Sequence, residues 1–301
     1  MDVSVIIVNY NTRDLLIQCL ASIQKQTKDV SYETIVVDNA SSDDSEACVK
    51  STFQDVIFIK NETNIGFGNA NNRGAQIASG KYLFLLNSDT VLENNAIKYM
   101  FDFMEHNSDS LKVGAIGGLL RDGYGRIAHS SRDFPTPYKM LWETLCSYCG
   151  IKLDTEQKDF FGKDFFSVEY ITGADLFLKR DLFDRLHGFD KSYFMYFEET
   201  DFQRRMALLG YKSMIIAEPK ILHLEGASFF KNAKQQISNA RRIMYDKSKL
   251  LYVSKHYNYI QYLLFRISYI SLRLVTLFDV KYTLRERVEY IRALTKKAIC
   301  E

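Results

Sequence analysis

Three short apolar runs rich in β-branched residues constrain the fold more than any other feature of the chain. They cover residues 3–8, 34–37 and 82–86, and helical stretches lie between them. Strands buried on both faces have this composition, so the sequence predicts a mostly parallel sheet in an α/β fold. Polar residues follow each run, at 9–11, 38–39 and 87–89. Because ligands of open α/β sheets bind outside the carboxyl ends of the strands, we expect these three clusters to converge on one crevice.

The segments between and after the runs carry helix signals. Asn11 or Thr12 is expected to cap a first helix, and residues 41–44 to open a second. Further along, a helix is expected to begin at residues 198–201 and to end near Gly210, and residues 214–217 predict a closing strand.

Composition indicates an ordinary globular protein. Of 301 residues, 47% are hydrophobic and 25% are charged, which excludes disorder as the main state. The five cysteines are odd in number and the start of the chain does not resemble a secretory signal, so a reduced, cytoplasmic protein is expected. Cys146 and Cys149 have the spacing of half a zinc site, but no second pair lies near them, and we interpret them as ordinary thiols.

Charge divides the chain near residue 230. Residues 1–230 carry 24 Lys/Arg against 32 Asp/Glu, whereas residues 231–301 carry 15 against 5. We predict a catalytic domain over 1–230 and a basic, Tyr-rich helical extension over 231–301, with helices at 237–257, 259–278 and 284–298.

Two arginines, Arg266 and Arg273, lie inside the apolar middle helix of that extension and argue against a membrane span. We therefore expect the extension to lie on a membrane surface. The alternative is packing on the catalytic domain or on a second copy in a homodimer. Nucleic acid is not expected as a partner, because the basic residues belong to long apolar helices.

Carboxylates occupy positions that suit chemistry. Asp38 and Asp89 follow strands, and Glu198, Glu199 and Asp201 stand at the start of a helix. A carboxylate aimed into the crevice can bind a metal or act as a general base. The alternative for each is that it only caps the next helix.

Five motifs in one order resemble the motif set of family-two glycosyltransferases of the GT-A fold, and in detail the rhamnosyltransferase-like branch. They are Val8-Asn-Tyr-Asn11, Val36-Val-Asp-Asn-Ala-Ser-Ser-Asp43, the segment 64–74, Leu86-Asn-Ser-Asp89, and Gly188-Phe-Asp with Phe197-Glu-Glu-Thr-Asp201. The match covers roughly residues 3 to 228. It implies an inverting, metal-dependent enzyme that moves rhamnose or a hexose from a dTDP- or UDP-sugar to a hydroxyl of a saccharide or lipid-linked saccharide. The setting would be cell-surface polysaccharide synthesis on the cytoplasmic face of the cell membrane.

The resemblance implies roles for residues that would bind the nucleotide. Asp38 would accept a hydrogen bond from N3–H of uracil or thymine; the alternative is that it holds the turn at Ser41. The base would be lined by Val8, Asn9, Tyr10 and Asn11. Asn64 and Gly66 belong to a loop that would border the nucleotide, where glycines allow close approach to a ligand. Arg73, expected in the first turn of the following helix, would reach the base or a phosphate.

Other implied roles concern the diphosphate and the sugar. Asn87, Ser88 and Asp89 would contact the donor, and Asp89 with His223 would bind Mn²⁺ or Mg²⁺. Asn87 departs from the usual Asp-x-Asp pattern, so one carboxylate would meet the metal. His223 is expected five residues beyond the last strand. Gly173 and Asp175 would form the wall behind the sugar.

Glu199 is the implied general base, and Glu198 or Asp201 could share that role. For Asp201 the alternative is a structural carboxylate that holds the loop before the helix. Two rival functions are a sugar nucleotidyltransferase and a catalytically inactive sugar-nucleotide-binding protein. The first expects a Gly-rich loop and a downstream lysine, which residues 9–12 lack. The joint presence of Asp38, Asp89 and Glu199 argues against the second.

Overall fold

The structure, a computed structural model, describes residues 1–151, 163–224 and 238–296. It divides into two compact units. The first comprises Met1–Asp133, Gln157–Lys191 and Glu198–Ala233, and the second comprises Phe134–Glu156, Ser192–Phe197 and Lys234–Glu301. The second unit thus includes Phe134–Glu156 and Ser192–Phe197, which the charge pattern had placed in the catalytic domain. The expected boundary at residue 230 lies outside the described residues, and the assignment of 1–230 as the catalytic domain stays a prediction.

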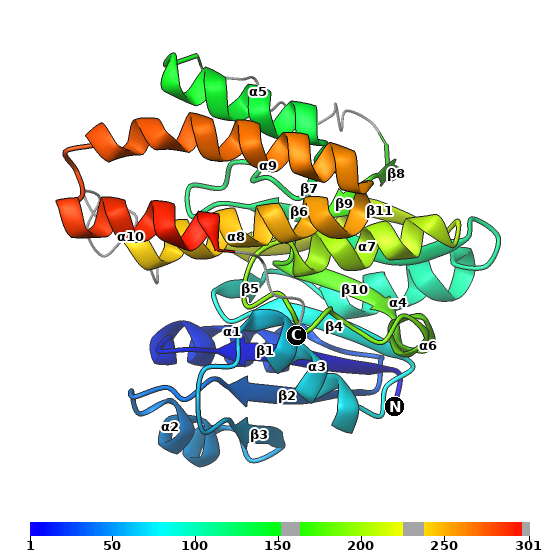
Figure 1. The fold of residues 1–301 in the computed structure, drawn as a ribbon. Helices are drawn as coiled ribbons and strands as arrows, with labels where there is room; N and C mark the ends of the chain where they lie inside the picture. The colour runs from blue at the N-terminus through cyan, green and yellow to red at the C-terminus, as the bar shows by residue number, and fades with distance from the viewer. Residues whose placement is uncertain (152–162, 225–237, 297–301) are drawn as a thin grey trace. The chain divides into compact units, whose positions relative to one another are not determined.

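The first unit is built on a mixed sheet with the strand order β3-β2-β1-β4-β10-β6-β11-β5, and β8 pairs with β11 (Figure 1). The strands are β1 (Val3–Asn9), β2 (Tyr32–Asp38), β3 (Val56–Lys60), β4 (Tyr82–Asn87), β5 (Thr90–Leu92), β6 (Val113–Arg121), β8 (Phe165–Val168), β10 (Asp175–Lys179) and β11 (Lys212–His223). A separate ribbon pairs β7 (Ser131–Arg132) with β9 (Tyr170–Ile171).

The predicted α/β fold with parallel strands is confirmed. β3, β2, β1 and β4 are mutually parallel, and β6 is parallel to β11. β10 lies between these two groups and is antiparallel to both β4 and β6. The three apolar runs form β1, β2 and β4, so the polar residues that follow them lie at one edge of the sheet.

Helices cover both faces of this sheet. Apolar side chains of α1 (Arg13–Gln26), α2 (Ser45–Thr52) and α4 (Ala96–Asn107) pack with one set of strand residues. Those of α3 (Phe67–Ile77), α6 (Arg180–Arg185) and α7 (Glu198–Leu208) pack with the alternate set. Strand side chains alternate between faces, which explains why Val5 and Ile7 belong to one cluster and Ile6 to the other.

Three local expectations need correction. Thr12 is the N-cap residue of α1, but its side chain does not cap the helix, because it bonds to Asn9 and Ser88 instead. The second helix begins at Ser45, after Asp44, rather than at Ser41. The closing strand is longer than predicted and ends at His223, so this histidine lies in β11 and not beyond it. The expected helix end near Gly210 is confirmed: α7 ends at Leu208 and Gly210 has a φ of 80°.

The second unit is helical. Its elements are α5 (Pro137–Tyr148), α8 (Asn239–His256), α9 (Tyr259–Arg273), a 3-10 turn η1 (Leu274–Phe278) and α10 (Leu284–Thr295). Within this unit α9 packs against α8, α10 and α5, as Figure 1 also shows. The three predicted C-terminal helices are confirmed, and side chains of Ser238, Asn258 and Thr283 cap their first turns. Cys146 and Cys149, both in this unit, are free thiols.

A buried carboxylate joins the last three helices. Asp246 of α8 is 1% exposed and accepts hydrogen bonds from the hydroxyls of Tyr269 (2.6 Å) and Tyr290. Arg273 Nη2 lies 3.1 Å from the same carboxylate. Buried polar groups need partners, and here α9 supplies two and α10 one for the carboxylate of α8, so the network fixes how the three helices face each other.

Candidate active site

The polar clusters at the ends of β1, β2 and β4 meet, as predicted. Asn9 Nδ2 donates a 2.7 Å hydrogen bond to Asp38 Oδ1, and its Oδ1 accepts one of 2.7 Å from Thr12 Oγ1. Thr12 Oγ1 also lies 2.9 Å from Ser88 Oγ. A continuous hydrogen-bonded path therefore runs from the end of β2 through β1 to the end of β4.

Asp38 is held firmly by its surroundings. Its carboxylate is 2% exposed; Oδ1 accepts from Asn9, and Oδ2 accepts from the Ser41 backbone N–H at 2.9 Å. The turn at Ser41 is thus one role of this carboxylate. Each carboxylate oxygen has two lone pairs, so these bonds leave capacity for a further donor. Beside it, Asn11 adopts a φ of 55° and bonds to Ser42, and Tyr10 is half exposed.

A chain of amide side chains connects Asp38 to Arg73. Asn61 N–H donates to the Asp38 carbonyl (2.8 Å), and Asn61 Nδ2 donates to Asn39 Oδ1 (2.7 Å). Arg73 Nη1 in turn donates to Asn61 Oδ1. Asn39 Nδ2 completes the chain with a bond of 3.2 Å to the carbonyl of Gly66. Arg73 is exposed and lies in the second turn of α3 rather than the first, because the helix begins at Phe67.

The glycines of the 64–74 segment allow close approach to protein groups. A Cβ placed on Gly74 would lie 2.6 Å from Ile6 Cγ2, so this glycine lets α3 press onto β1. A Cβ on Gly68 would lie 3.2 Å from the Cβ of Glu198. Close packing within the protein thus accounts for Gly68 and Gly74, and the approach of this segment to a ligand stays a prediction. Gly66 has a φ of 87°, and its N–H bonds to Asn64 Oδ1 (2.9 Å) in the turn before α3.

Asp89 and His223 lie together, although 134 positions separate them in the sequence. The antiparallel register of β5 and β11 places His223 opposite Thr90, and the Leu224 N–H donates to the Asp89 carbonyl at 2.9 Å. His223 Nε2 is 3.3 Å from Asp89 Oδ1, and both side chains are mostly buried. Within the described ranges no group of three His, Cys, Asp or Glu could hold a metal ion. The pair offers one carboxylate oxygen and one imidazole nitrogen, which fits a cation that takes its other ligands from phosphate and water.

The two glutamates at the start of α7 differ in environment. Glu198 is 4% exposed, and its Oε2 is buried without a hydrogen-bond partner among the described residues. Burial raises its pKa well above the usual range, and the neighbouring Glu199 carboxylate raises it further. Glu199 is half-buried; burial raises its pKa as well, while its hydrogen bonds and the charge of Arg132 lower it. Burial therefore disfavours the charged form of both carboxyls, and only Glu199 has hydrogen bonds and a nearby cation that oppose this effect.

A backbone hydrogen bond holds the Asn87 motif to the loop that also borders Glu199. The Asn87 N–H donates to the Ala174 carbonyl at 2.9 Å. A Cβ on the adjacent Gly173 would lie 3.6 Å from Glu199 Cγ. The carboxyl edge of β4 and the start of α7 thus border the same loop.

Two predicted site residues have structural surroundings instead. Asp175 is fully buried in β10, where its Oδ2 accepts a 2.6 Å bond from the Gly118 N–H and burial raises its pKa well above the usual range. With no exposed surface it cannot contact a sugar in this structure, which corrects that expectation. Asp201 is 2% exposed and pairs with Arg205, which also bonds to the carbonyls of Leu186 and Gly188. The structural alternative for Asp201 agrees with these contacts.

Gln203 is a residue at this site that the sequence did not single out. Its amide bonds to both the N–H and the C=O of Ile171, each at 2.8 Å, and so positions the strand before Gly173 on α7. Its position one helical turn after Glu199 was the only sequence feature that pointed to it. A lone glutamine in a helix is commonly a surface residue, so this feature was not enough.

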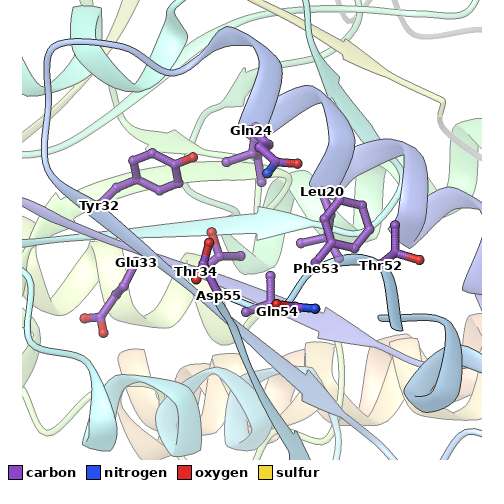
Figure 2. A pocket seen from close by; sticks show the side chains of 11 residues that line it. Leu20, Gln24, Tyr32, Glu33, Thr34, Thr52, Phe53, Gln54 and Asp55 are labelled. Carbon is purple, nitrogen blue, oxygen red and sulfur yellow. The ribbon is translucent and has the colours of Figure 1, made fainter. Parts of the chain in front are cut away.

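A cavity of about 520 Å³ lies elsewhere, between α1 and the loop before β3 (Figure 2). It is lined by Tyr32, Glu33 and Thr34 at the start of β2. The sequence-predicted residues lie at the opposite ends of the strands, so this cavity is separate from the candidate site.

Proteins with open α/β sheets bind their ligands outside the carboxyl ends of the parallel strands, and the polar edge formed by β1, β2 and β4 lies there. Residues 4–161, more than half of the chain, match the family model described as "Glycosyl transferase family 2". The chain belongs to glycosyl transferase family 2. Its activity class is therefore glycosyl transfer.

Relatives agree with the rhamnosyltransferase-like branch. An N-acetylglucosaminyl-diphospho-decaprenol L-rhamnosyltransferase of Mycobacterium tuberculosis is 25% identical over 243 residues, covering 73% of this chain and 75% of that protein. The glycosyltransferase GlyG of Streptococcus pneumoniae serotype 4 is 26% identical over 246 residues, covering 80% of this chain and 77% of that protein.

Solved structures share the fold. GalNAc-T7 with UDP, GalNAc and Mn²⁺ superposes with a TM-score of 0.61 at 16% identity, covering 99% of this chain and 56% of that chain. The mannosyltransferase PcManGT from Pyrobaculum calidifontis, with GDP-Man and Mn²⁺, gives a TM-score of 0.55 at 18% identity, covering 97% of this chain and 74% of that chain. The predicted GT-A fold is confirmed.

Proposed function

We propose that this enzyme transfers a sugar from a dTDP- or UDP-sugar to an acceptor hydroxyl with inversion at the anomeric carbon. The observation that carries the proposal is the set of neighbouring polar residues along one sheet edge. It begins at Asp38, passes through Asn9, Thr12 and Ser88 to the Asp89 motif, and reaches Glu199 by way of the loop at Gly173. The residues that we propose for the nucleotide, the diphosphate and the proton transfer therefore lie along one edge of the sheet.

For the donor we propose a pyrimidine nucleotide. The carboxylate of Asp38 retains acceptor capacity, and N3–H of uracil or thymine is a donor that cytosine lacks. Rhamnose is the first choice for the sugar, since the Mycobacterium relative is named an L-rhamnosyltransferase, and a hexose is the second. Arg73, near Asp38 through Asn61, would reach the base or a phosphate.

Asp89 and His223 are the residues that would hold a divalent cation. Two structural neighbours contain Mn²⁺, and the oxygen–nitrogen pair of this chain suits Mn²⁺ or Mg²⁺. When bound, such a cation would neutralise the charge that develops on the leaving diphosphate.

Glu199 would act as the general base. Its side chain is half-buried, whereas that of Glu198 is buried, and it borders the Gly173 loop. It would take the proton of the acceptor hydroxyl while that oxygen bonds to the anomeric carbon. The bond between the anomeric carbon and the diphosphate oxygen breaks in the same step, with its electron pair leaving on the nucleotide diphosphate. Attack opposite the leaving group gives inversion.

For the acceptor we propose a saccharide linked to a lipid diphosphate, used in cell-surface polysaccharide synthesis at the cytoplasmic face of the membrane. The name of the Mycobacterium relative includes such an acceptor, N-acetylglucosaminyl-diphospho-decaprenol.

The test is a thermal-shift screen of nucleotide sugars with and without Mn²⁺. A ligand at one hundred times its dissociation constant stabilises the native state by about 2.7 kcal/mol. We expect stabilisation by dTDP- or UDP-sugars that requires Mn²⁺ and is lost in Asp89→Ala but kept in Asp184→Ala, whose carboxylate is exposed on α6. Stronger stabilisation by GDP-sugars, or an undiminished Mn²⁺ effect in Asp89→Ala, would contradict the donor and metal assignments.

A further inference from the structure

The second unit has an exposed apolar surface made by two adjacent helices. On α9 the side chains of Leu264 and Ile267 are 61% and 57% exposed, and at the end of η1 Phe278 is 82% exposed. On α5, which packs against α9, Trp142 is 47% exposed and Leu145 is 41% exposed. With Ile260 these residues define what we call the α5–α9 surface. Patches of this kind on a folded unit mark interaction sites.

The arginines of α9 do not interrupt this surface, because both are engaged by the helical unit. Arg273 bonds to Asp246 and to the hydroxyl of Tyr269. Arg266 Nη2 donates to the carbonyl of Thr295 at 2.7 Å. Residues 259–278 are all described, and none of the exposed ones is charged. The two charges that argued against a membrane span therefore bond to groups of the helical unit.

The same contacts determine how α9 could meet a bilayer. Among the described residues, one segment, Tyr259–Phe278, is long and apolar enough to cross a membrane by length and composition. Phe265 and Tyr269 of this segment are nevertheless buried in the helical unit. A span would have to break these contacts and the pairing of Arg273 with Asp246. An orientation in the plane of the interface keeps them.

Cations flank the surface. Exposed lysines or arginines stand before α9, after η1 and along α10, at positions 255, 281, 285, 292 and 296, and α5 adds Lys139. The exposed acids on these helices are Glu143 of α5 and Glu289 of α10, so cations outnumber acids. An anionic lipid surface complements this arrangement. A second copy does not, because a two-fold contact would bring the same cationic residues against each other. Trp142, the single tryptophan of the chain, is of a residue type enriched where apolar core and headgroups meet.

We propose that the α5–α9 surface lies on an anionic bilayer, with its apolar side chains in the headgroup and acyl boundary. The inference extends the proposed lipid-linked acceptor, because it brings the enzyme to the membrane that holds such an acceptor. It also adds α5, a helix from the middle of the sequence, to the predicted role of the C-terminal extension.

The test uses the full chain and does not depend on sugar transfer. Sedimentation with phosphatidylcholine vesicles that contain phosphatidylglycerol is compared with sedimentation with pure phosphatidylcholine vesicles, and the fluorescence of Trp142 is recorded. We expect binding to the anionic vesicles, a blue shift of the emission, and weaker binding at high salt. Leu264→Glu/Ile267→Glu should lose binding. Leu208→Glu, at an exposed leucine of the first unit, should keep it.

Circular dichroism checks that the variants fold, and Leu264→Ser/Ile267→Ser replaces the acidic pair if they do not. Vesicle binding that is equal in wild type and surface variant would overturn the proposal. The proposal would also be overturned if the wild type were a dimer that does not bind vesicles and the substitutions made it monomeric. The surface would then be a subunit interface. If the wild type did not bind nucleotide sugars, the proposed function would be contradicted but the membrane proposal would not, since vesicle binding is measured without donor.

Discussion

Removal of the Asp246 carboxylate is expected to destabilise the helical unit strongly. Asp246→Ala leaves the guanidinium of Arg273, whose side chain is 20% exposed, without its acid, and leaves the fully buried Tyr290 hydroxyl without its acceptor. Loss of one partner of a buried ion pair costs about 3–5 kcal/mol, and an unsatisfied buried hydroxyl costs about 1–3 kcal/mol. These costs overlap, since Arg273 still bonds to Tyr269. We therefore expect a loss of about 3–5 kcal/mol in the free energy of unfolding.

Urea unfolding followed by circular dichroism measures this loss. Glu289→Ala, at an exposed acid of α10, is the matched control and should change stability by less than about 0.5 kcal/mol. Replacing both charged partners, in Asp246→Leu/Arg273→Met, should cost less than the two single changes added together, because no unpaired charge is left buried. A loss below about 1 kcal/mol in Asp246→Ala, or strict additivity in the double variant, would refute the idea that this network holds the three helices together.

Two further predictions concern burial and packing. Burial lowers the pKa of Lys249 to about 8, so between that pH and the ordinary pKa of a lysine the unfolded chain binds more protons than the folded one. Stability should therefore rise as the pH increases from about 8 towards 10, by roughly 1–3 kcal/mol, and Lys249→Met should abolish the rise; a flat profile in wild type would contradict this. Gly74→Ala would place a Cβ 2.6 Å from Ile6 Cγ2 and should cost about 1–3 kcal/mol, whereas Gly123→Ala, with its nearest atom at 3.9 Å, should be nearly neutral in the same urea assay.

The sheet and its polar edge could be predicted because both depend on local sequence. The runs at 3–8, 34–37 and 82–86 are apolar on both sides, and each is followed at once by the polar residue that the structure brings to the edge. The bond from Asn9 to Asp38 follows from parallel pairing alone, since these residues are opposite each other in the register of β1 and β2.

Features that depend on distant pairing could not be predicted. The bond between Asn87 and Ala174 exists because β10 is antiparallel to β4, and no local pattern specifies that pairing. His223 was expected beyond the last strand because Pro219 interrupts the apolar run. β11 continues past it with an irregularity in its pairing with β6. Asp175 was expected at the wall behind the sugar from the family resemblance, yet it starts the antiparallel β10 and is enclosed against Gly117 and Gly118.

The hydrogen bonds of Arg266 and Arg273 within the helical unit could not be predicted from the sequence either. Both arginines were counted against a membrane span, because composition reports that a charge is present and not what neutralises it. Asp246, which neutralises Arg273, lies 27 residues away on another helix.

In the proposed mechanism Glu199, and not Glu198, takes the proton of the acceptor hydroxyl. The most direct test of this assignment compares sugar transfer by Glu199→Gln and Glu198→Gln under conditions where each binds donor as the wild type does. Loss of a general base lowers the transfer rate by about 10²- to 10⁴-fold, and we predict that loss for Glu199→Gln. Glu198 is buried, its Oε2 has no hydrogen-bond partner among the described residues, and burial raises its pKa, so a neutral glutamine there should preserve most of the activity. Because the pKa of Glu199 is raised, wild-type kcat/KM should also rise with pH as that carboxyl ionises. Near-normal transfer by Glu199→Gln together with an inactive Glu198→Gln would contradict the account.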